Sequence, residues 1–295
     1  MKRSGIVSIA GRPNVGKSTL LNRLVGQKLS ITAHKPQTTR HSILGIRTLG
    51  ETQVVFVDTP GIHVDGRHKL NQVLNRTASS ALHDVDLVLL MVQAMLWNDD
   101  DQRAFDLVAS SGVPFFIVVN KVDTVKHRKD MLPYLANLPG HARLQDVLIV
   151  SARSGNGVDA LDAALDRFVP EGEWRYGEDE LTDRSSRFLA AEAVREQLTR
   201  LLSAELPYAL SVEIETYEES SKLLRIGAVI WVDKKSQKGI VIGKGGERLK
   251  EIGRRARLSM ETLFDKPVFL EAWVRVKEGW ADDDRALRSL GYDTL

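Results

Sequence analysis

Short apolar runs alternate with segments of helical length from residue 5 to about residue 168. The runs cover residues 6–10, 54–57, 87–92, 115–119 and 147–150, and they are rich in the β-branched residues that favour strands. Parallel strands need long crossover connections, which are usually helices. The alternation therefore predicts an α/β domain with a mostly parallel sheet and helices on both faces.

A different pattern follows residue 186. Apolar residues recur at helical spacing over residues 187–204, residues 210–217 and 223–232 have the pattern of paired strands, and residues 268–276 alternate as a last strand. The stretch between the two patterns carries proline, glycine and charge without periodicity, which is typical of a connector. We expect a first domain at 1–170, a linker at 171–186, a smaller α+β domain at 187–279 and a tail at 280–295.

Composition agrees with this division and excludes several classes of protein. The 295 residues exceed one ordinary domain of about 100 to 200 residues, so two domains are expected. The formal net charge is only +2, so attraction to nucleic acid requires a local basic cluster. The absence of cysteine excludes disulfides, cysteine-ligated zinc, iron–sulfur clusters and a cysteine nucleophile. Since the N-terminus has no signal-peptide pattern, we expect cytoplasmic localisation.

A phosphate-binding pattern follows the first predicted strand. Residues 11–18 fit G-x-x-x-x-G-K-[ST] directly before a predicted helix. The glycines let backbone N–H groups surround a phosphate at the helix N-terminus, the lysine brings positive charge to the β and γ phosphates, and the serine hydroxyl can bind Mg²⁺. The nucleotide-binding candidates of this segment are Gly11, Arg12, Pro13, Asn14, Val15, Gly16, Lys17, Ser18 and Thr19.

A second pattern separates guanine from adenine nucleotides. Asn120, Lys121 and Asp123 follow the run 115–119, so the Asp123 carboxylate is expected at the carboxyl end of a strand, where ligands of α/β proteins bind. A carboxylate can accept hydrogen bonds from N1–H and the exocyclic amine of guanine, whereas adenine presents an acceptor at the matching ring nitrogen. For this motif alone, an ordinary strand-to-helix turn capped by Asn and Asp is the alternative.

Further nucleotide contacts are expected after two other apolar runs. After residues 54–57, a carboxylate can hold Mg²⁺ and a glycine N–H can meet the γ phosphate. After residues 147–150, a short backbone segment would pack on the guanine base. The candidates at these two positions are Asp58, Thr59, Pro60 and Gly61, and Ser151 and Ala152.

The magnesium shell needs one more hydroxyl. Thr38 and Thr39 lie in an otherwise polar segment after the first predicted helix, where a hydroxyl can complete the shell when GTP is bound. We choose Thr39 over Thr38. The expected Mg²⁺ ligands are therefore Ser18, Thr39 and Asp58.

A basic cluster lies in the second domain, around a G-x-x-G loop at residues 243–246. In its setting of helix, loop, helix and flanking strands, this loop resembles that of a type II KH domain, where glycines leave room for a nucleic-acid backbone. Nine of the residues from 234 to 257 are basic and two are acidic, which predicts phosphate binding; a solvated basic helix face is the alternative. The RNA-binding candidates are Lys235, Lys238, Gly243, Lys244, Gly245, Gly246, Arg248, Lys250, Arg254 and Arg255.

The nucleotide motifs, in this order and spacing, resemble the translation-factor-like class of P-loop GTPases over residues 5–168. Longer segments at residues 11–19, 30–41, 205–208 and 279–292 make nearly the whole chain similar to the Era family of bacterial GTPases. This resemblance implies GTP or GDP with Mg²⁺ as ligands, the 3′ end of 16S ribosomal RNA as target, a role in small (30S) ribosomal subunit assembly, and peripheral contact with the inner membrane. We expect a monomer.

The residue after Gly61 bears on how the nucleotide is hydrolysed. After Gly61, many regulatory GTPases carry a glutamine that orients the attacking water, but this chain has Ile62, which cannot form side-chain hydrogen bonds. The resemblance implies slow intrinsic hydrolysis that a partner or K⁺ raises, with Asn14 as the K⁺ ligand. An ordinary turn residue is the alternative for Asn14. The catalytic candidates are Lys17, Thr39, Gly61 and Asn14.

The sequence favours a GTP-hydrolysing switch that binds RNA, and two other functions compete with it. In a switch, the nucleotide would set the conformation of residues 32–40 and 61–68 and so the RNA affinity. A GTPase acting in RNA modification would need a cofactor motif or a cysteine for group transfer, and the sequence has neither. An RNA-binding module that holds GTP structurally, with negligible turnover, is compatible with Ile62.

Other residues with chemical potential are assigned to structure. Trp231 and Trp273 lie on predicted strands, where core packing is favoured over base stacking. The seven histidines show no metal-ligand spacing. The three consecutive aspartates at 282–284 are interpreted as the first turn of a helix and not as a metal cluster.

Overall fold

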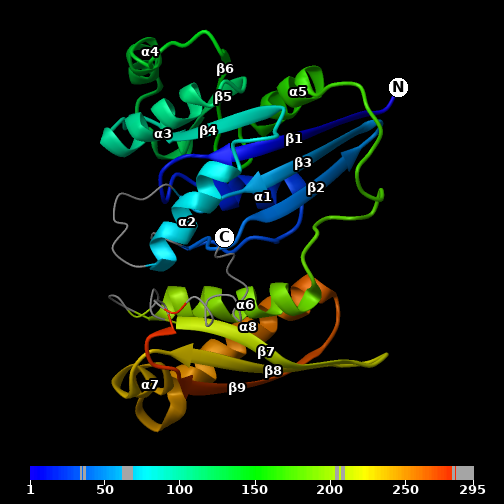
Figure 1. The fold of residues 1–295 in the computed structure, drawn as a ribbon, viewed down its shortest axis with the longest axis vertical. Coiled ribbons are helices and arrows are strands. Elements are labelled where there is room, and N and C mark those ends of the chain that lie inside the picture. The colour runs from blue at the N-terminus through cyan, green and yellow to red at the C-terminus, as the bar shows by residue number, and fades with distance from the viewer. Residues whose placement is uncertain are drawn as a thin grey trace. The chain divides into compact units, whose positions relative to one another are not determined.

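The computed structural model describes residues 1–33, 35, 38–61, 69–202, 206, 210–280 and 283, without the side chains of residues 69–72, 75 and 128. The described chain forms two compact units. Of the described residues, the first contains Met1–Ser30, residues 39–61 and Leu74–Asp183, and the second contains those of Ile31–Thr38, residues 69–73 and those from Arg184 onward. Each unit has its own sheet (Figure 1).

The sheet of the first unit has six strands in the order β2-β3-β1-β4-β5-β6. The strands are β1 (Arg3–Ala10), β2 (Ile43–Leu49), β3 (Thr52–Asp58), β4 (Leu87–Gln93), β5 (Phe115–Asn120) and β6 (Leu144–Ile149). Every neighbouring pair is parallel except β2–β3, which is antiparallel. The expected mostly parallel sheet is confirmed. Strand β2 was not predicted, because Gly45 and Arg47 interrupt its apolar run.

Helices pack on both faces of this sheet. They are α1 (Lys17–Val25), α3 (Asp99–Ser110), α4 (Met131–Ala136) and α5 (Val158–Phe168). Helix α2 (Lys69–Ser80) comes between β3 and β4 in the chain, and its first five residues belong to the second unit. Successive side chains of a strand point to opposite faces. Accordingly, the ring of Phe115 in β5 contacts that of Phe105 in α3, with 5.8 Å between centroids, and the ring of Phe116 contacts that of Phe168 in α5 at 5.7 Å.

The chain between α5 and the second unit is held against the first unit. The side chain of Gln53 in β3 accepts the N–H groups of Arg175 at 2.9 Å and Tyr176 at 3.0 Å, and it donates to the Tyr176 carbonyl oxygen at 2.9 Å. The Ile46 N–H of β2 donates to the Leu181 carbonyl oxygen at 2.8 Å. This connector therefore follows strands β2 and β3 and belongs to the first unit up to Asp183.

The second unit has the element order expected for a type II KH fold. Its elements are α6 (Ser186–Leu201), β7 (Leu210–Glu219), β8 (Leu224–Val232), α7 (Lys235–Ile242), α8 (Glu247–Phe264) and β9 (Val268–Val276). The three strands lie in the order β7-β8-β9, with β7 antiparallel and β9 parallel to β8. The side chain of Ser185 accepts the Phe188 N–H and so caps the start of α6.

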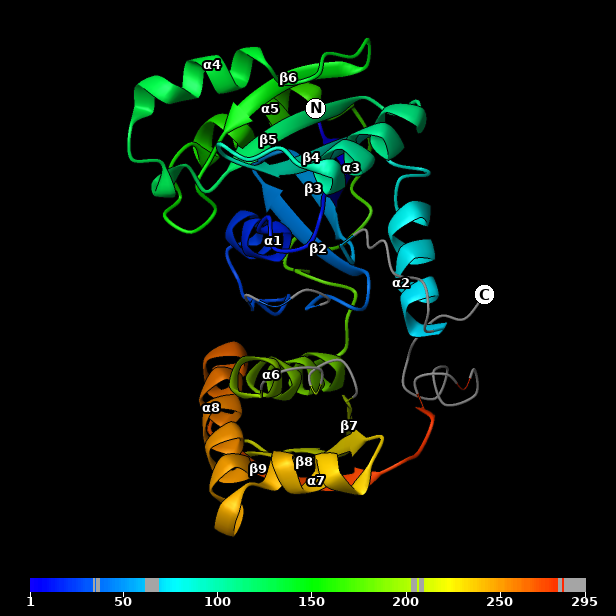
Figure 2. The same cartoon turned by 90° about the vertical axis from the view of Figure 1, so that its left-hand side faces the viewer.

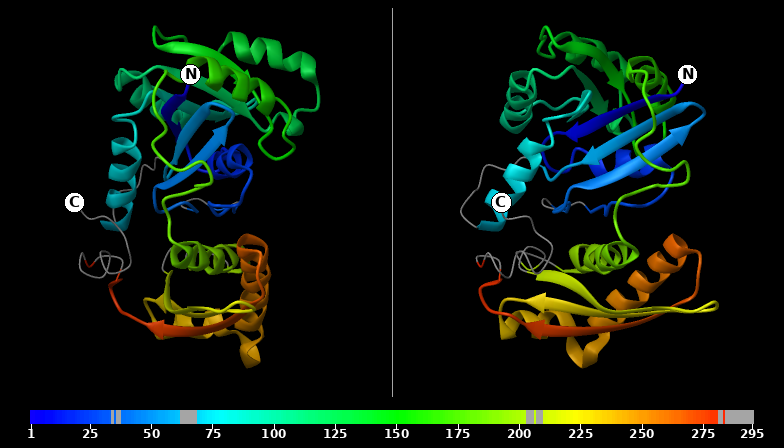
Figure 3. Two further views of the ribbon diagram at one scale, coloured as in Figure 1. Left: turned by 90° about the vertical axis from the view of Figure 1, so that its right-hand side faces the viewer. Right: turned by 45° about the vertical axis from the view of Figure 1, so that its right-hand side comes forward.

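One face of this sheet holds the core of the second unit. Figures 2 and 3 show α6 and α8 on the same side of the three strands. Along α8, Ile252, Ala256 and Met260 recur at the spacing of one helix face and are buried against alternate residues of β8, among them Ala228 and Ile230. The intervening residues of β8 and β9 point to the opposite face.

Two tryptophans of the second unit correct an expectation from the sequence. Trp231 and Trp273 do not belong to the core, because both lie on the face away from it, where Trp231 is half-buried and Trp273 is 43% exposed. Trp280, at the start of the expected tail, is fully buried. The expectations for Ile62 to His68, and for Asp282 and Asp284, concern residues outside the described part of the chain. Among the described helices, none combines the length and apolar character needed to cross a bilayer.

Candidate functional site

The loop between β1 and α1 contains the phosphate-binding pattern, from Gly11 at the end of the strand to Gly16 at the N-cap of α1. Gly16 has a φ of 108°, and a Cβ there would lie 2.3 Å from Nδ2 of Asn120, so only glycine fits. Asn14 also has a positive φ of 63°. The first turn of α1 begins directly after this loop with Lys17, Ser18 and Thr19, as phosphate binding at a helix N-terminus requires.

Lys17 is buried against this loop, with 6% of its surface exposed. Its Nζ donates to the carbonyl oxygens of Gly11 at 2.9 Å and Arg12 at 3.0 Å. Burial lowers the pKa of Lys17 to about 8, although the nearby Asp58 carboxylate opposes this shift. A buried ammonium group of this kind gains stability from an anion such as phosphate.

Three oxygen-bearing side chains converge next to Lys17. The hydroxyl of Ser18 lies 2.7 Å from Oγ1 of Thr39 and donates to Oδ2 of Asp58 at 2.7 Å. Asp58 is fully buried, and its Oδ1 has no hydrogen-bond partner among the described residues. Burial raises the pKa of Asp58, and the hydroxyls and Lys17 oppose that shift. By contrast, the hydroxyl of Thr38 donates to the Lys35 carbonyl oxygen at 2.6 Å.

This cluster fits a divalent cation. Mg²⁺ prefers oxygen ligands, and a buried carboxylate oxygen without a donor has a free position for a metal ion or its water. Ser30, which the sequence did not single out, also donates to Oδ2 of Asp58, at 2.8 Å. It lies at the start of the polar segment that leads to Thr39, and no local pattern distinguishes it from any other serine.

The turn after β3 lies against the phosphate loop. The hydroxyl of Thr59 donates to the Ile9 carbonyl oxygen at 3.0 Å, which fixes the turn to β1. A Cβ on Gly61 would lie 2.9 Å from Cγ and 3.0 Å from the nitrogen of Pro13. Only glycine allows this close approach, which brings Gly61 beside the loop that surrounds the phosphates. Pro60 joins the two residues.

Asn120 connects the guanine motifs to the phosphate loop. Its Nδ2 donates to the Val15 carbonyl oxygen at 2.7 Å, and its Oδ1 accepts the N–H of Ala152 at 2.9 Å. The hydroxyl of Ser151 donates to Oδ1 of Asp123 at 2.7 Å. Three loops far apart in sequence are therefore joined by two side chains, Asn120 and Ser151, and the Asp123 carboxylate is oriented at their edge.

An ion pair that the sequence did not indicate supports the same loop. Nε of Arg12 donates to both carboxylate oxygens of Asp101, at 2.9 and 3.0 Å, and Asp101 also completes the N-terminal cap of α3. Lys121 donates from Nζ to Oε1 of Gln93 at 3.0 Å, and burial, followed by the charge of Arg12, lowers its pKa. Both contacts join residues from different loops, so sequence spacing gives no signal for them.

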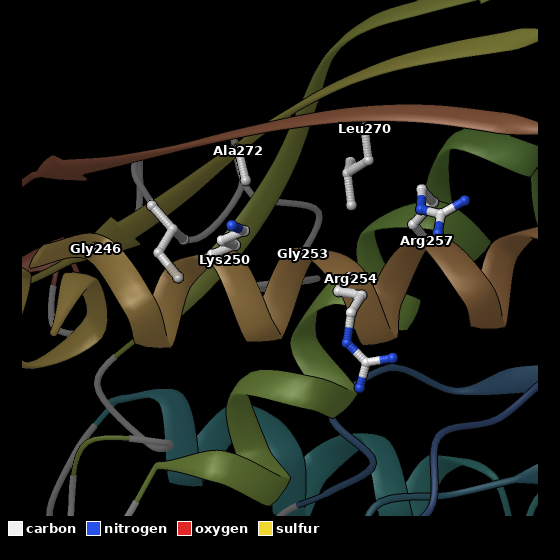
Figure 4. A pocket seen from close by; sticks show the side chains of 8 residues that line it. Gly246, Lys250, Gly253, Arg254, Arg257, Leu270 and Ala272 are labelled. Atoms are coloured by element: carbon white, nitrogen blue, oxygen red, sulfur yellow. The ribbon is translucent and has the colours of Figure 1, made fainter.

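A cavity of about 450 Å³ lies between α8 and β9 in the second unit. Figure 4 shows Leu270 and Ala272 pointing from β9 toward α8, with Lys250 beside Ala272 and Arg257 beside Leu270. The cavity thus has an apolar floor and a basic rim, as a site for a base and its phosphate requires. Its lining residues are Gly246, Leu249, Lys250, Gly253, Arg254, Arg257, Leu270 and Ala272.

The G-x-x-G loop lies at one end of this cavity and contains a short 3₁₀ turn at Lys244–Gly246. Gly243, Gly245 and Gly246 have φ values of 75°, 60° and 82°. A Cβ added to Gly245 or Gly246 would meet no atom within 4 Å, so the loop is open to an approaching backbone. The lysine candidates Lys235 and Lys238 on α7 and Lys244 in the loop are all exposed.

The predicted arginines differ in their surroundings. Arg248 donates to the Ile240 carbonyl oxygen at 2.6 Å, which joins α8 to α7. Arg254 and Arg255 both pair with Glu251, at 2.8 and 2.6 Å, and their hydrogen bonds lower the pKa of Glu251 to about 2. Arg254 also lines the cavity, and Arg255 does not. Arg257 lines it too but was not among the candidates.

Comparison with known proteins identifies a family for each of the two domains. Residues 6–121 match the family model described as 50S ribosome-binding GTPase, and residues 205–281 match that of the KH domain. The chain is 55% identical to the GTPase Era of Xanthomonas axonopodis pv. citri (strain 306), over 99% of this chain and 97% of that protein. It is 52% identical to the GTPase Era of Pseudomonas aeruginosa (strain LESB58), over 99% and 96%.

The chain belongs to the Era family of GTPases. The expected resemblance to this family, with its GTPase and KH domains, is confirmed. Two solved Era structures, each 37% identical in sequence, superpose with a TM-score of 0.94. One is Era in complex with MgGDPNP and nucleotides 1506–1542 of 16S ribosomal RNA, covering 99% of both chains. The other is a point variant of Aquifex aeolicus Era bound to GDP·AlF₄⁻, covering 98% of this chain and 99% of that one.

Proposed function

We propose that this Era-family protein binds GTP with Mg²⁺, hydrolyses it, and uses the state of the nucleotide to control RNA binding by its KH domain. The observation that carries the proposal is the cluster of Ser18, Thr39 and Asp58 beside the buried Lys17. It joins the phosphate loop, the turn after β3 and the segment that contains Thr39. Such a cluster can respond to the presence of a γ phosphate.

The nucleotide site divides its tasks among named groups. The Asp123 carboxylate, oriented by Ser151, accepts hydrogen bonds from guanine. Lys17 neutralises charge on the β and γ phosphates, and Gly61, which lies beside Pro13 of the phosphate loop, would donate its N–H to the γ phosphate. Ser18, Thr39 and Asp58 would hold Mg²⁺, which when bound stabilises the negative charge of the phosphoryl group that is transferred.

We assign RNA to the cavity between α8 and β9, which we call the groove, and to the adjoining G-x-x-G loop. Its basic rim and apolar floor suit single-stranded RNA, whose bases are free to enter. We further propose the 3′ end of 16S ribosomal RNA as target, because a relative with the same fold was solved with nucleotides 1506–1542 of that RNA. The division that follows is a GTPase domain at 1–170, a linker at 171–186, a KH domain at 187–279 and a tail at 280–295.

Family membership extends the proposal to the cell. Binding of the 3′ end of 16S ribosomal RNA would give the protein a role in assembly of the 30S subunit. The resemblance to the Era family adds a cytoplasmic location and peripheral contact with the inner membrane. K⁺ near Asn14 would raise the rate of hydrolysis by offsetting charge between the β and γ phosphates. Asn14 lies in the phosphate loop and has a left-handed backbone, with a φ of 63°.

The segment that contains Thr39 also provides a route from nucleotide to RNA. Residues Ile31–Thr38 belong to the second unit, where the Glu196 side chain accepts the Thr32 N–H at 3.0 Å and Nη2 of Arg200 donates to the Thr32 carbonyl oxygen at 3.0 Å. Both partners lie on α6, which packs on the KH sheet. A nucleotide that moves Thr39 would therefore move the segment Ile31–Thr38, which is hydrogen-bonded to α6.

A single-turnover hydrolysis assay tests the proposal against a module that holds GTP structurally. GTP bound to the full chain is expected to be hydrolysed in the presence of Mg²⁺, faster with K⁺ or with a 16S 3′-end RNA. The Asp58→Asn variant, which removes the buried charge, is expected to lose the Mg²⁺ dependence. Turnover no faster than that of GTP in buffer under every condition would favour the structural role.

A further inference from the structure

The two faces of the KH sheet have different surroundings. The core face contacts α6, α7 and α8, whose residues are buried against it. On the opposite face, which we call the outer face, none of the described helices packs. The outer face is formed by the alternate residues Arg225, Gly227, Val229 and Trp231 of β8 and Phe269, Glu271, Trp273 and Arg275 of β9.

Trp273 packs against strand β8 on this outer face. Val229 is its partner in the neighbouring strand and is fully buried although it does not belong to the core. A Cβ on Gly227 would lie 3.2 Å from Cζ3 of Trp273, so the missing side chain makes room for the indole against the strand. The ring covers the strand with one side, and 43% of the side chain remains exposed.

A second aromatic ring on β9 is also accessible. Phe269 is 46% exposed, and the guanidinium of Arg225 lies 5.4 Å from its ring centroid. Trp231 is partly buried between Arg275 and the Lys277 ammonium, each 5.9 Å from its ring. Alternating exposed rings and cations on a sheet face are a surface on which bases can stack and phosphates can bind.

Charge is divided across the outer face. The carboxylates Glu213, Glu215 and Glu218 lie on β7. Arg275 of β9 is paired with Glu215 at 2.5 Å. Along β8, β9 and the residue that follows β9, two further basic side chains, Arg225 and Lys277, accompany one carboxylate, Glu271. The half that carries the exposed rings is therefore the basic half, which favours a polyanion over an acidic or neutral protein surface.

This basic half is continuous with the groove. Strand β9 is an edge strand of the described sheet. Its residues Leu270 and Ala272 line the groove, while Phe269 and Trp273, their immediate neighbours in sequence, lie on the outer face. A strand of RNA that leaves the groove needs only to pass around β9 to reach these rings.

We propose that single-stranded RNA leaving the groove passes around β9 and stacks further bases on Trp273 and Phe269, with Arg225 and Lys277 contacting its phosphates. The proposal rests on RNA binding in the groove, the function proposed above, and adds a second subsite to it. It makes the protein a reader of a longer RNA segment than the groove alone accommodates.

Two RNA lengths separate the subsite from the groove. The short probe is a segment of about four nucleotides, the number that a G-x-x-G loop clamps, and the long probe is the same segment extended to about twelve nucleotides. The full-length protein is expected to bind the long probe more tightly. Phe269→Ala and Trp273→Ala are each expected to weaken binding of the long probe by on the order of 5-fold to 100-fold and to leave the short probe unchanged.

Further variants distinguish stacking from a structural role. Trp273→Phe keeps an aromatic surface and is expected to retain most of the affinity for the long probe. Arg225→Gln is expected to lower the salt dependence of long-probe binding by about one phosphate contact. Leu258→Ala is the matched control, because Leu258 is 43% exposed on α8 and does not line the groove. It is expected to bind both probes like the wild type.

The outcomes keep the two proposals apart. Long-probe affinity that is unchanged in Phe269→Ala and Trp273→Ala would overturn the outer-face subsite and leave this surface to a protein partner. Equal loss for both probes would also overturn it, since the rings would then act only by supporting the groove. Failure of the wild-type protein to bind the short probe would instead contradict RNA binding in the groove itself.

Discussion

The guanidinium of Arg195 on α6 donates to the carbonyl oxygen of Thr38, the residue directly before Thr39. Arg195 is buried and held by both carboxylate oxygens of Glu192, at 2.6 and 2.7 Å. Thr39, one peptide bond away, lies 2.7 Å from the hydroxyl of Ser18. Two adjacent residues thus belong to the KH-containing unit and to the nucleotide site, respectively, and a single peptide bond connects them.

Asp123→Asn is expected to change which nucleotide the protein binds. An asparagine amide donates where guanine also donates, so affinity for GDP is expected to fall by on the order of a hundredfold or more. Xanthine carries a carbonyl in place of the exocyclic amine, so the variant is expected to bind XDP more tightly than the wild type does. Titration of both proteins with GDP and XDP measures the change in nucleotide preference. An unchanged preference for GDP would show that Asp123 does not contact the base.

Lys17→Ala is expected to abolish useful nucleotide binding. The buried ammonium would contribute two or more charge-assisted hydrogen bonds to phosphate, each of about 1.5–3 kcal/mol, so affinity for GDP should fall by on the order of a thousandfold. Lys126→Ala is the control, because Lys126 is exposed and lies outside the loop. Calorimetric titration of both variants, with circular dichroism to check folding, makes the comparison. A Lys17→Ala protein that binds GDP like the control would contradict the assignment.

Gly245→Asp is expected to block RNA binding and to leave basal GTP hydrolysis unchanged. Gly245 has a φ of 60°, and the added carboxylate would stand at the open loop where RNA phosphates approach. Gly172→Asp introduces the same side chain in the connector, where a Cβ meets no atom within 4 Å. RNA binding by filter retention and GTP turnover are measured for both variants. Equal RNA affinity in the two would remove the loop from the site.

Tyr134 is expected to make stability fall at alkaline pH. Its hydroxyl donates to the carbonyl oxygens of Gln93 at 3.1 Å and Leu96 at 3.3 Å, and burial raises its pKa to about 12. Between the ordinary tyrosine pKa of about 10 and this value, the unfolded chain loses a proton that the folded chain keeps, so the free energy of unfolding decreases as pH rises.

The Tyr134→Phe variant removes this titration. It is expected to be less stable than the wild type near neutral pH by about 1 kcal/mol, because the hydrogen bond from the hydroxyl to the Gln93 and Leu96 carbonyl oxygens is lost. Between pH 10 and pH 12 its stability should fall less steeply than that of the wild type. Urea unfolding at several pH values measures both slopes. Parallel slopes would show that Tyr134 is not the residue responsible.

The strands and loops that depend on a local sequence pattern could be predicted from the sequence. The run that becomes β5 is apolar on both faces, and Phe115 and Phe116 indeed pack on opposite helices. The glycines and Lys17 of the phosphate loop stand at fixed spacing after a strand. Strand β2 was not predicted because Gly45 and Arg47 interrupt its apolar run, although both residues are buried in the folded chain.

The parts that depend on long-range contacts were not accessible. The hydrogen bond from Asn120 to Val15 joins residues 105 positions apart, and that between Arg12 and Asp101 spans 89. No periodicity or spacing encodes such pairs. The outer face of the KH sheet illustrates the same limit: an isolated strand pattern shows that Trp273 alternates with Ala272, but not which of the two faces a helix covers.

RNA affinity in three nucleotide states tests the central claim most directly. The wild type and the double variant Glu192→Gln/Arg195→Gln, which removes both buried charges together, are titrated at fixed salt with a 16S 3′-end RNA and a scrambled control. Each is measured with a GTP analogue, with GDP and without nucleotide. The wild type is expected to bind the 3′-end RNA about 5-fold to 150-fold more tightly with the analogue, and the double variant to lose this difference. Equal affinity of the wild type in all three states would contradict coupling between the nucleotide and RNA sites.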